Sequence, residues 1–140
     1  MKEEINATKI GKYFKNKNYD LTDKQIQKLT YYAYVWYYVK HKNKLFEEKP
    51  QAWIHGPVFR SLFNSMKRKK FYDEEDIELD DKITDFLELI YKVYGKYSGN
   101  ELEEMTHAEA PWQIARGDLE YDEPSQEEIK DSDIIEYYGS

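Results

Sequence analysis

The sequence contains no cysteine among its 140 residues, and this absence excludes several kinds of chemistry. Disulfides, thiolate metal sites, cysteine nucleophiles and thiol redox switches all need that side chain. The six glycines are isolated, so no glycine-rich loop can hold a phosphate group. The N-terminus has no apolar signal core, and no apolar run approaches the ~20 residues of a membrane span. We therefore expect a soluble, cytoplasmic protein with no membrane partner.

Charge is distributed unevenly along the chain. Residues 1–70 contain 16 Lys and Arg against 6 Asp and Glu, a balance of +10, whereas residues 71–140 contain 5 against 22, a balance of −17. One interpretation is that the two halves fold against each other and neutralise their charges. The other is that a basic face and an acidic face serve different partners. The acidic half argues against a nucleic-acid partner, since it would repel phosphates unless it folded to the far side.

Helix signals dominate the chain. Thr22 and Gln25 form a capping box in front of apolar residues at 3-4 spacing, which predicts a helix over residues 22–40. This helix is so rich in aromatic residues that we expect it to be central, with Lys24, Lys28 and Tyr34 on its other face. Each buried tyrosine among the 14 in the chain should find a hydrogen-bond partner for its hydroxyl.

The remaining segments support the same fold class. Apolar spacing and cap residues predict further helices, with Pro57 as a first helical residue and Asp80, Ser98 and Ser125 as caps. The last helix could divide near residues 131–133. We expect a minor two-stranded β element near residues 45–54. The prediction is an all-α fold and a single domain over residues 1–140, with helices at residues 7–17, 22–40, 57–69, 80–97, 98–106, 111–117 and 125–138.

Two blocks, Gln51–Arg60 and Thr106–Trp112, hold two of the three histidines and two of the three tryptophans. His107 and Glu109 match the His-x-Glu fragment of zinc deaminases, but those enzymes need a cysteine pair that this chain lacks. The histidines are too scattered for a metal site, and we expect no cofactor. An acid–base pair of His55 with Glu109 or Asp23 stays an open alternative.

The structural interpretation of these two blocks is that they support the fold. His55 would brace the turn before Pro57, and the Gly56-Pro57 pair would set the direction of the following helix. His107, near a helix C-terminus, would be cationic or hydrogen-bonded. Trp36, Trp53 and Trp112 would lie in the core, or serve as anchors for a partner.

Three segments, in this order, resemble the motifs of the Panacea domain family, which includes SocA-like antitoxins and phage-associated GepA-like proteins. Lys24–Trp36 is similar to the tyrosine-rich helix of the family. Ala52–Val58 is similar to its Ala-Trp and Gly-Pro-Val motif, with histidine where tyrosine is commoner, and Glu101–Trp112 to its Thr-His and Pro-Trp segment. The resemblance assigns these scaffold residues: Lys28, Leu29, Tyr32, Trp36, Trp53, His55, Gly56, Pro57, Val58, Thr106, His107, Pro111 and Trp112.

The resemblance implies a helical antitoxin that is not an enzyme and that neutralises a cognate protein toxin, the product of a neighbouring gene, by stoichiometric binding. Some members instead deliver the toxin to a AAA+ protease. One alternative is a phage or prophage protein that inhibits a host immune protein. Another is an enzyme that uses His55 and His107. Self-association also stays open.

Toxin choice should depend on surface outside the motifs. The regions concerned are the loop 41–50, the basic patch 67–70 and the acidic C-terminal segment. The candidate partner-binding residues are Lys44, Phe46, Arg60, Lys67, Arg68, Lys69, Lys70, Tyr121 and Tyr137.

Overall fold

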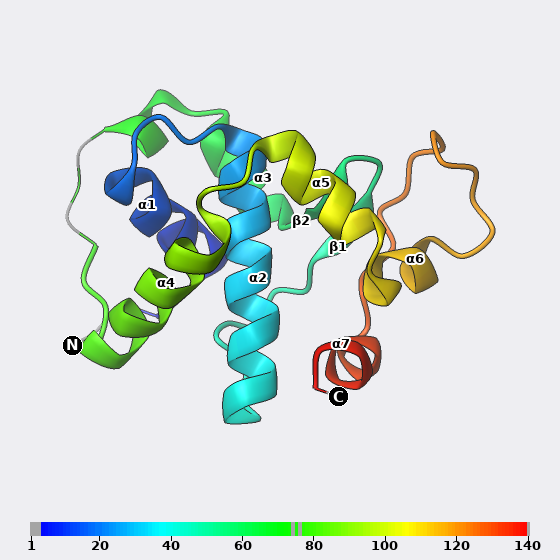
Figure 1. Cartoon of the computed structure of the whole chain (residues 1–140). Helices are drawn as coiled ribbons and strands as arrows, with labels where there is room; N and C mark the ends of the chain where they lie inside the picture. Colours follow the sequence, from blue (N-terminus) through cyan, green and yellow to red (C-terminus); the bar gives the residue numbers. More distant parts are fainter. Residues whose placement is uncertain (1–3, 74, 76, 140) are drawn as a thin grey trace.

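The computed structural model describes residues 4–73, 75 and 77–139, and in this part of the chain helices predominate (Figure 1). The all-α prediction is confirmed, with one small antiparallel hairpin as the β element. The elements, in chain order, are α1 (Ala7–Lys17), α2 (Asp23–His41), β1 (Gln51–Trp53), β2 (Gly56–Val58), α3 (Arg60–Met66), the 3-10 helix η1 (Lys69–Tyr72), α4 (Asp81–Tyr94), α5 (Gly99–His107), α6 (Ala110–Arg116) and α7 (Asp131–Tyr138).

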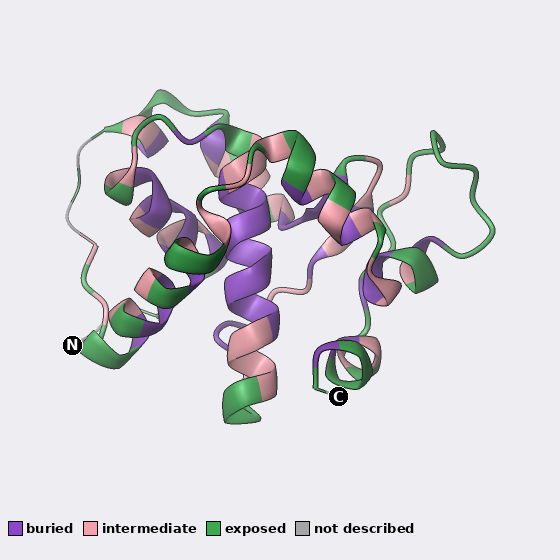
Figure 2. Ribbon diagram, viewed as in Figure 1, coloured by how far each residue is buried: buried purple, intermediate pink, exposed green. Residues whose placement is uncertain are grey.

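Helix α2 is the centre of the fold. The predicted capping box is present, with the Thr22 hydroxyl and the Gln25 side chain each accepting a backbone N–H at the start of the helix. α1, α4, α5, α7 and the hairpin all pack against α2. Figure 2 shows that it is buried through its middle, and its exposed residues lie at the two ends, Asp23 at the start and Lys40 and His41 at the C-terminal end. Neighbours surround it as predicted, and for this reason Lys28 and Tyr34, on its second face, are also buried.

Hydrogen bonds between aromatic side chains join α2 to the C-terminal helices. The hydroxyls of Tyr31 and Tyr138 lie 3.0 Å apart, and Tyr32 donates to the carboxylate of Glu109 at 3.0 Å. Tyr32 also stacks on Tyr94, with ring centroids 4.0 Å apart. The expected partner is therefore present for these tyrosines. The buried Tyr34 hydroxyl, by contrast, has no hydrogen-bond partner among the described residues.

The hairpin corrects two expectations. Its strands pair Gln51–Trp53 with Gly56–Val58, so the first strand lies within the predicted residues 45–54 and the second lies beyond them. Pro57 pairs with Ala52 in β2 and is not the first residue of a helix. Helix α3 begins only at Arg60, because the chain completes the hairpin before it turns into the helix.

The C-terminal half contains one confirmed and one wrong capping box. Ser98 and Glu101 cap α5 as predicted, and Gly117 ends α6 with a φ of 60°. Ser125 does not begin a helix. The segment after it lies against β1 instead, where the Ala52 amide donates to the Glu127 carbonyl at 2.8 Å. Helix α7 therefore begins at Asp131, where division of a longer helix was predicted.

Candidate functional site

The hairpin is the place where the three motif segments meet. From α2, Gln27 forms two hydrogen bonds with the backbone of Phe59, accepting from its N–H at 2.9 Å and donating to its carbonyl at 3.1 Å. One residue further on, Lys28 donates from Nζ to the carbonyl of Pro57 at 3.2 Å. The central helix thus holds the backbone at the end of the hairpin through two buried polar side chains.

The other side of the hairpin is held by α5 and α6. Side chains of these two helices donate hydrogen bonds to backbone carbonyls of the hairpin. These bonds fix the path of the chain and do not involve the hairpin side chains. Three side chains donate to consecutive carbonyls: Arg116 to Ala52 at 3.3 Å, Trp112 to Trp53 at 2.8 Å and His107 to Ile54 at 2.8 Å.

His107 is held as a neutral imidazole. A carbonyl can only accept, so Nε2 donates to Ile54, and Nδ1 is left to accept from the Tyr121 hydroxyl at 3.2 Å. The ring also stacks on Trp112, with centroids 4.0 Å apart. Burial lowers the pKa of His107, although the hydrogen bond to Ile54 opposes the shift. The hydrogen-bonding role expected for this residue is present, and the cationic form is disfavoured.

Gly56 is required by its surroundings as well as by its backbone angle. Its φ is +106°, a backbone conformation that residues other than glycine rarely adopt. A Cβ at this position would lie 2.5 Å from Cε of Lys28 and 2.9 Å from Oγ1 of Thr106. One residue from each of the three motif segments therefore meets at this point.

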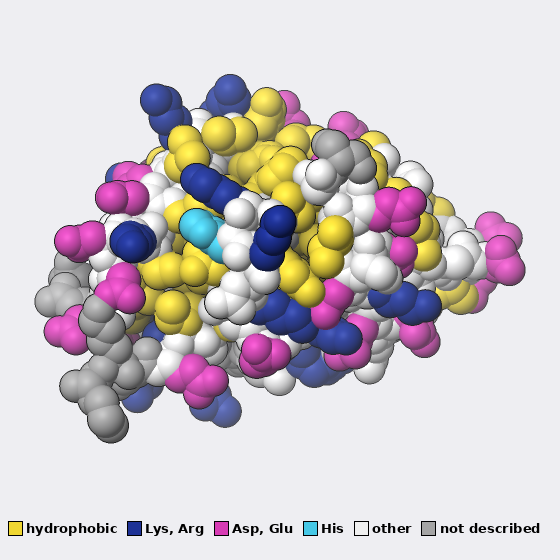
Figure 3. Space-filling model, turned by 90° about the horizontal axis from the view of Figure 1, so that it is seen from below, with side chains coloured by type: hydrophobic (Ala, Val, Ile, Leu, Met, Phe, Trp, Pro, Cys, Tyr) yellow, Lys and Arg dark blue, Asp and Glu magenta, His cyan; other side chains and the backbone are white. Residues whose placement is uncertain are grey.

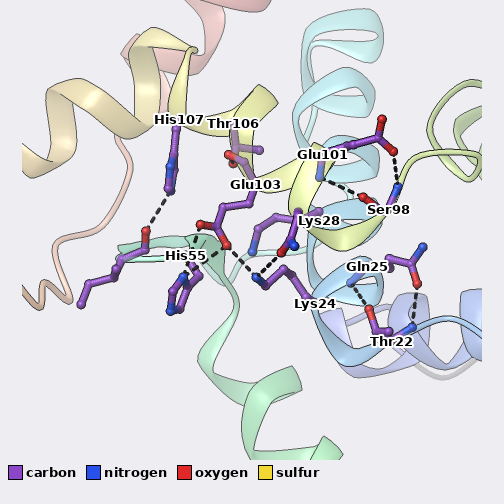
Figure 4. Close-up of polar contacts among 12 residues, drawn as sticks. Thr22, Lys24, Gln25, Lys28, His55, Ser98, Glu101, Glu103, Thr106 and His107 are labelled. Atoms are coloured by element: carbon purple, nitrogen blue, oxygen red, sulfur yellow. Dashed lines mark hydrogen bonds and ion pairs between the residues drawn. The ribbon is translucent and has the colours of Figure 1, made fainter. Parts of the chain in front are cut away.

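A polar cluster lies beside the turn of the hairpin, centred on Glu103 of α5 (Figure 4). Lys24 donates to its carboxylate at 2.7 Å, and Nδ1 of His55 lies 3.2 Å from the same oxygen. Burial alone would raise the pKa of Glu103, but the hydrogen bonds from Lys24 and His55 outweigh it and lower the pKa. His55, with its side chain 70% exposed, thus braces the turn of the hairpin before Pro57 through its contact with Glu103 of α5.

The acid–base pairs proposed from the sequence do not form. Glu109 is hydrogen-bonded to the hydroxyls of Tyr32 and Tyr138, and Asp23 accepts from Tyr72. Within the described residues, no group of three His, Asp or Glu side chains could hold a metal ion. In the same part of the chain, no helix has the length and apolar character needed to cross a membrane.

The outer side of the hairpin and the neighbouring face of α3 form a surface that we call the hairpin face. It consists of aromatic and apolar side chains with cations laid over them. The Arg60 guanidinium lies 5.2 Å from the Trp53 ring centroid, and Lys67 Nζ lies 4.4 Å from that of Phe63. Its members are Trp53, His55, Val58, Arg60, Phe63 and Lys67.

Two cavities open on the hairpin face, and Trp53, His55 and Val58 line both. One, of about 260 Å³, lies between the hairpin and residues 124–126. The other, of about 220 Å³, lies between the hairpin, the start of α2 and α3. Trp53 is therefore only half-buried and lies at the surface between them, unlike Trp112, which belongs to the core.

The other candidate partner-binding residues have different environments. Phe46 is a core residue, packed against Tyr34 and Phe59, so its assignment to the surface is wrong. The loop 41–50 is expected to be exposed because most of its residues are polar, yet the Phe46 side chain fills space beside α2. Lys44 forms an ion pair with Asp131 at 2.9 Å.

The exposed candidates fall into separate places. The basic patch 67–70 is exposed as predicted and continues from the end of α3 into η1. Tyr121 and Tyr137 are 63% and 43% exposed. They lie on the segment after α6 and on α7, so these residues do not make one continuous site with the basic patch.

A second apolar surface lies where α2 ends. Figure 3 shows hydrophobic side chains gathered on this side of the molecule, with cationic groups among them. A groove of about 320 Å³ runs here between α2 and α4, lined by Trp36, Phe86 and Tyr94. Leu89 and Val93 of α4 also line it and are about half exposed.

Sequence reasoning missed Gln27, Glu103 and Arg116. Gln27 and Arg116 are polar residues within apolar stretches, which was a usable signal of a buried hydrogen-bonding role. Glu103 is one of many acidic residues in the second half and carried no such signal.

Residues of all three motif segments thus fix the backbone of one hairpin. In comparisons with known families, the model of the antitoxin SocA-like, Panacea domain matches residues 26–113, and the chain belongs to this family. The matched range contains all the scaffold residues assigned from the sequence. Comparison with curated proteins and with solved structures gave no match.

Proposed function

We propose that this chain neutralises a cognate protein toxin by direct, stoichiometric binding, and that the hairpin face is the contact surface. The observation that supports an antitoxin role is the family match. A partner toxin follows from that role, and binding without catalysis is the simplest mechanism consistent with the site. The hairpin face is preferred among the exposed surfaces for two physical reasons.

The first reason is preorganisation. Hydrogen bonds from α2, α5 and α6 hold the hairpin backbone, so its outward side chains lose little further freedom when a partner binds. Arg60, Phe63 and Lys67 lie outside the family motifs, so these outward side chains could differ between antitoxins while the backbone bonds are kept. Such a surface suits a family of antitoxins with different partners.

The second reason is the chemistry of the side chains. Tryptophan and arginine are the residues most enriched among those that dominate binding energies, and Arg60 lies directly over Trp53. Lys67 adds a second cation at the end of α3. A toxin with an acidic, partly aromatic surface would fit, and charge would speed its association in a salt-dependent way.

The test is co-expression and titration with the product of the adjacent reading frame as the toxin. Arg60→Glu with Lys67→Glu should abolish neutralisation while the thermal midpoint stays close to that of the wild type. Leu89→Ser with Val93→Ser, on the second apolar surface, is the matched control and should still neutralise. In titrations with purified proteins, neutralisation should require one equivalent of antitoxin. Complete protection at a small fraction of one equivalent, without a protease, would show an enzymatic mechanism instead.

A further inference from the structure

The cavity between the hairpin, α2 and α3 combines apolar walls with an excess of cations. Trp53, Val58, Phe63 and Met66 supply the apolar lining. Three lysines, from α2 and from the end of α3, also line it, together with His55 and one acidic residue, Asp23. Asp23 already accepts a hydrogen bond from the Tyr72 hydroxyl. The cavity is therefore electropositive and open to the outside.

Lys28 is the unusual member of this lining. Its side chain is 1% exposed, and its ammonium group donates one hydrogen bond, to the Pro57 carbonyl. An ammonium group has three N–H donors, and a buried charge is costly unless it is paired. Within the described residues no carboxylate lies within ion-pair distance of Lys28. Glu103, the acidic group that acts on the charge of Lys28, is already bonded to Lys24 and His55.

We propose that this cavity receives a carboxylate side chain of the toxin, an aspartate or a glutamate, which forms an ion pair with Lys28. The proposal rests on the proposed function and specifies what the toxin must present to the hairpin face. Lys24 lines the same cavity and would lie beside the incoming carboxylate. The apolar walls would enclose the methylene groups of the acidic side chain and strengthen the pair by excluding water.

The charges around Lys28 predict how binding would depend on pH. Burial lowers its pKa to about 7, Glu103 on α5 opposes that shift, and Lys24 on α2 reinforces it. Lys67 and Asp23 also line the cavity. A carboxylate stabilises the charged ammonium form, so the bound state takes up a proton where the free chain is neutral. Binding should therefore weaken as the pH rises through neutrality.

The first experiment uses acetate as the probe and needs no toxin. The pKa of Lys28 is measured by NMR of the full chain carrying ¹³Cε-lysine, in acetate and in chloride at equal ionic strength. Acetate should raise the pKa of Lys28 and chloride should not, while the signal of the distant Lys92 stays unchanged. Equal values in acetate and chloride would overturn the proposal.

The second experiment measures toxin affinity against pH for the wild type, Lys28→Met and His55→Asn. Lys28→Met should weaken binding about tenfold or more, a loss of about 1.4 kcal/mol, and should remove the decline in affinity with pH. His55→Asn removes the imidazole that also lines the cavity and should keep that decline. Unchanged neutralisation by Lys28→Met would overturn the carboxylate site but leave the proposed function standing. Loss of neutralisation in the Arg60 and Lys67 variant tests the proposed function separately.

Discussion

The indole N–H of Trp112 donates a 2.8 Å hydrogen bond to the backbone carbonyl of Trp53, joining two family motifs that are 59 residues apart in the sequence. The same indole stacks on His107, which bonds the next carbonyl along the hairpin. The buried Trp112 therefore acts on the half-buried Trp53 through the backbone. It fixes where the Trp53 ring is presented without touching its outward side.

Replacing Trp112 by phenylalanine tests this anchoring role. The phenyl ring can still stack on His107, but the carbonyl of Trp53 loses its donor, which should lower the free energy of unfolding by about 1–3 kcal/mol. Urea denaturation measures the change. Trp36→Phe is the control, because its indole donates to the Tyr94 hydroxyl at the edge of a groove, where water can replace it. An equal loss in the two variants would contradict the anchoring role.

Gly56→Ala should be among the most damaging small substitutions in the chain. The left-handed backbone costs a side-chain-bearing residue about 1–2 kcal/mol, and crowding against Lys28 and Thr106 adds about 1–3 kcal/mol. Gly117→Ala isolates the first contribution, since Gly117 also has a positive φ but no atom within 4 Å of its ideal Cβ. Thermal or urea unfolding of both variants gives the comparison. A larger loss of unfolding free energy in Gly117→Ala than in Gly56→Ala would contradict a destabilising contribution from crowding at Gly56.

Local signals predicted the helices well where nothing competed with them. Thr22 and Ser98 both form the predicted capping boxes, with the hydrogen bonds made within the first turn of each helix. Ser125 carries the same local pattern and fails. The segment after it pairs with β1, through the amides of Ala52 and Ile129, and this distant partner outweighs the local preference.

The sequence predicted which residues belong to the site, but not the contacts they make. The resemblance selected Lys28, His107 and Trp112, but their shared task of holding hairpin carbonyls depends on distances that the sequence does not contain. The pairing of His55 with Glu103 joins residues 48 positions apart and replaces the partners considered from the sequence. The burial of Phe46 was not predictable for a similar reason, since the sequence of a mostly polar loop does not show that one of its side chains reaches the core.

Glu109 should make the stability of the protein depend on pH in mildly acidic solution. Burial raises its pKa, against the opposing hydrogen bonds from Tyr138 and Tyr32. Above the ordinary value of 4.5 the folded chain thus holds a proton that the unfolded chain has lost, so stability should fall as the pH rises through this range. Glu109→Gln should flatten that decline. Glu103 and Glu88 have lowered pKa values, so they change the stability mainly below pH 4.5 and do not obscure the effect of Glu109 above it.

Lys28→Met should stabilise the protein at neutral pH. The pKa of Lys28 falls from 10.5 to about 7 on folding, so between these values the unfolded chain binds a proton that the folded chain does not. The stability of the wild type relative to Lys28→Met should therefore rise with pH across that window and stay level below it. Lys28→Met removes the cost of burying an unpaired ammonium, and the loss of the donor to the Pro57 carbonyl offsets part of that gain. The net result should be a rise in the free energy of unfolding at neutral pH of about 1–4 kcal/mol.

The measurement is urea denaturation of both proteins from about pH 6 to about pH 9.5. Unfolded tyrosines begin to ionise at the upper end, but both proteins have the same tyrosines, so this effect cancels in the difference between them. Lys24→Met is the control, because Lys24 is partly exposed and ion-paired with Glu103, and its removal should not produce this pH-dependent difference. A difference between wild type and Lys28→Met that does not narrow with rising pH would show that Lys28 is not forced towards its neutral form. A gain in stability together with weaker toxin binding would place Lys28 among the residues kept for binding rather than for folding.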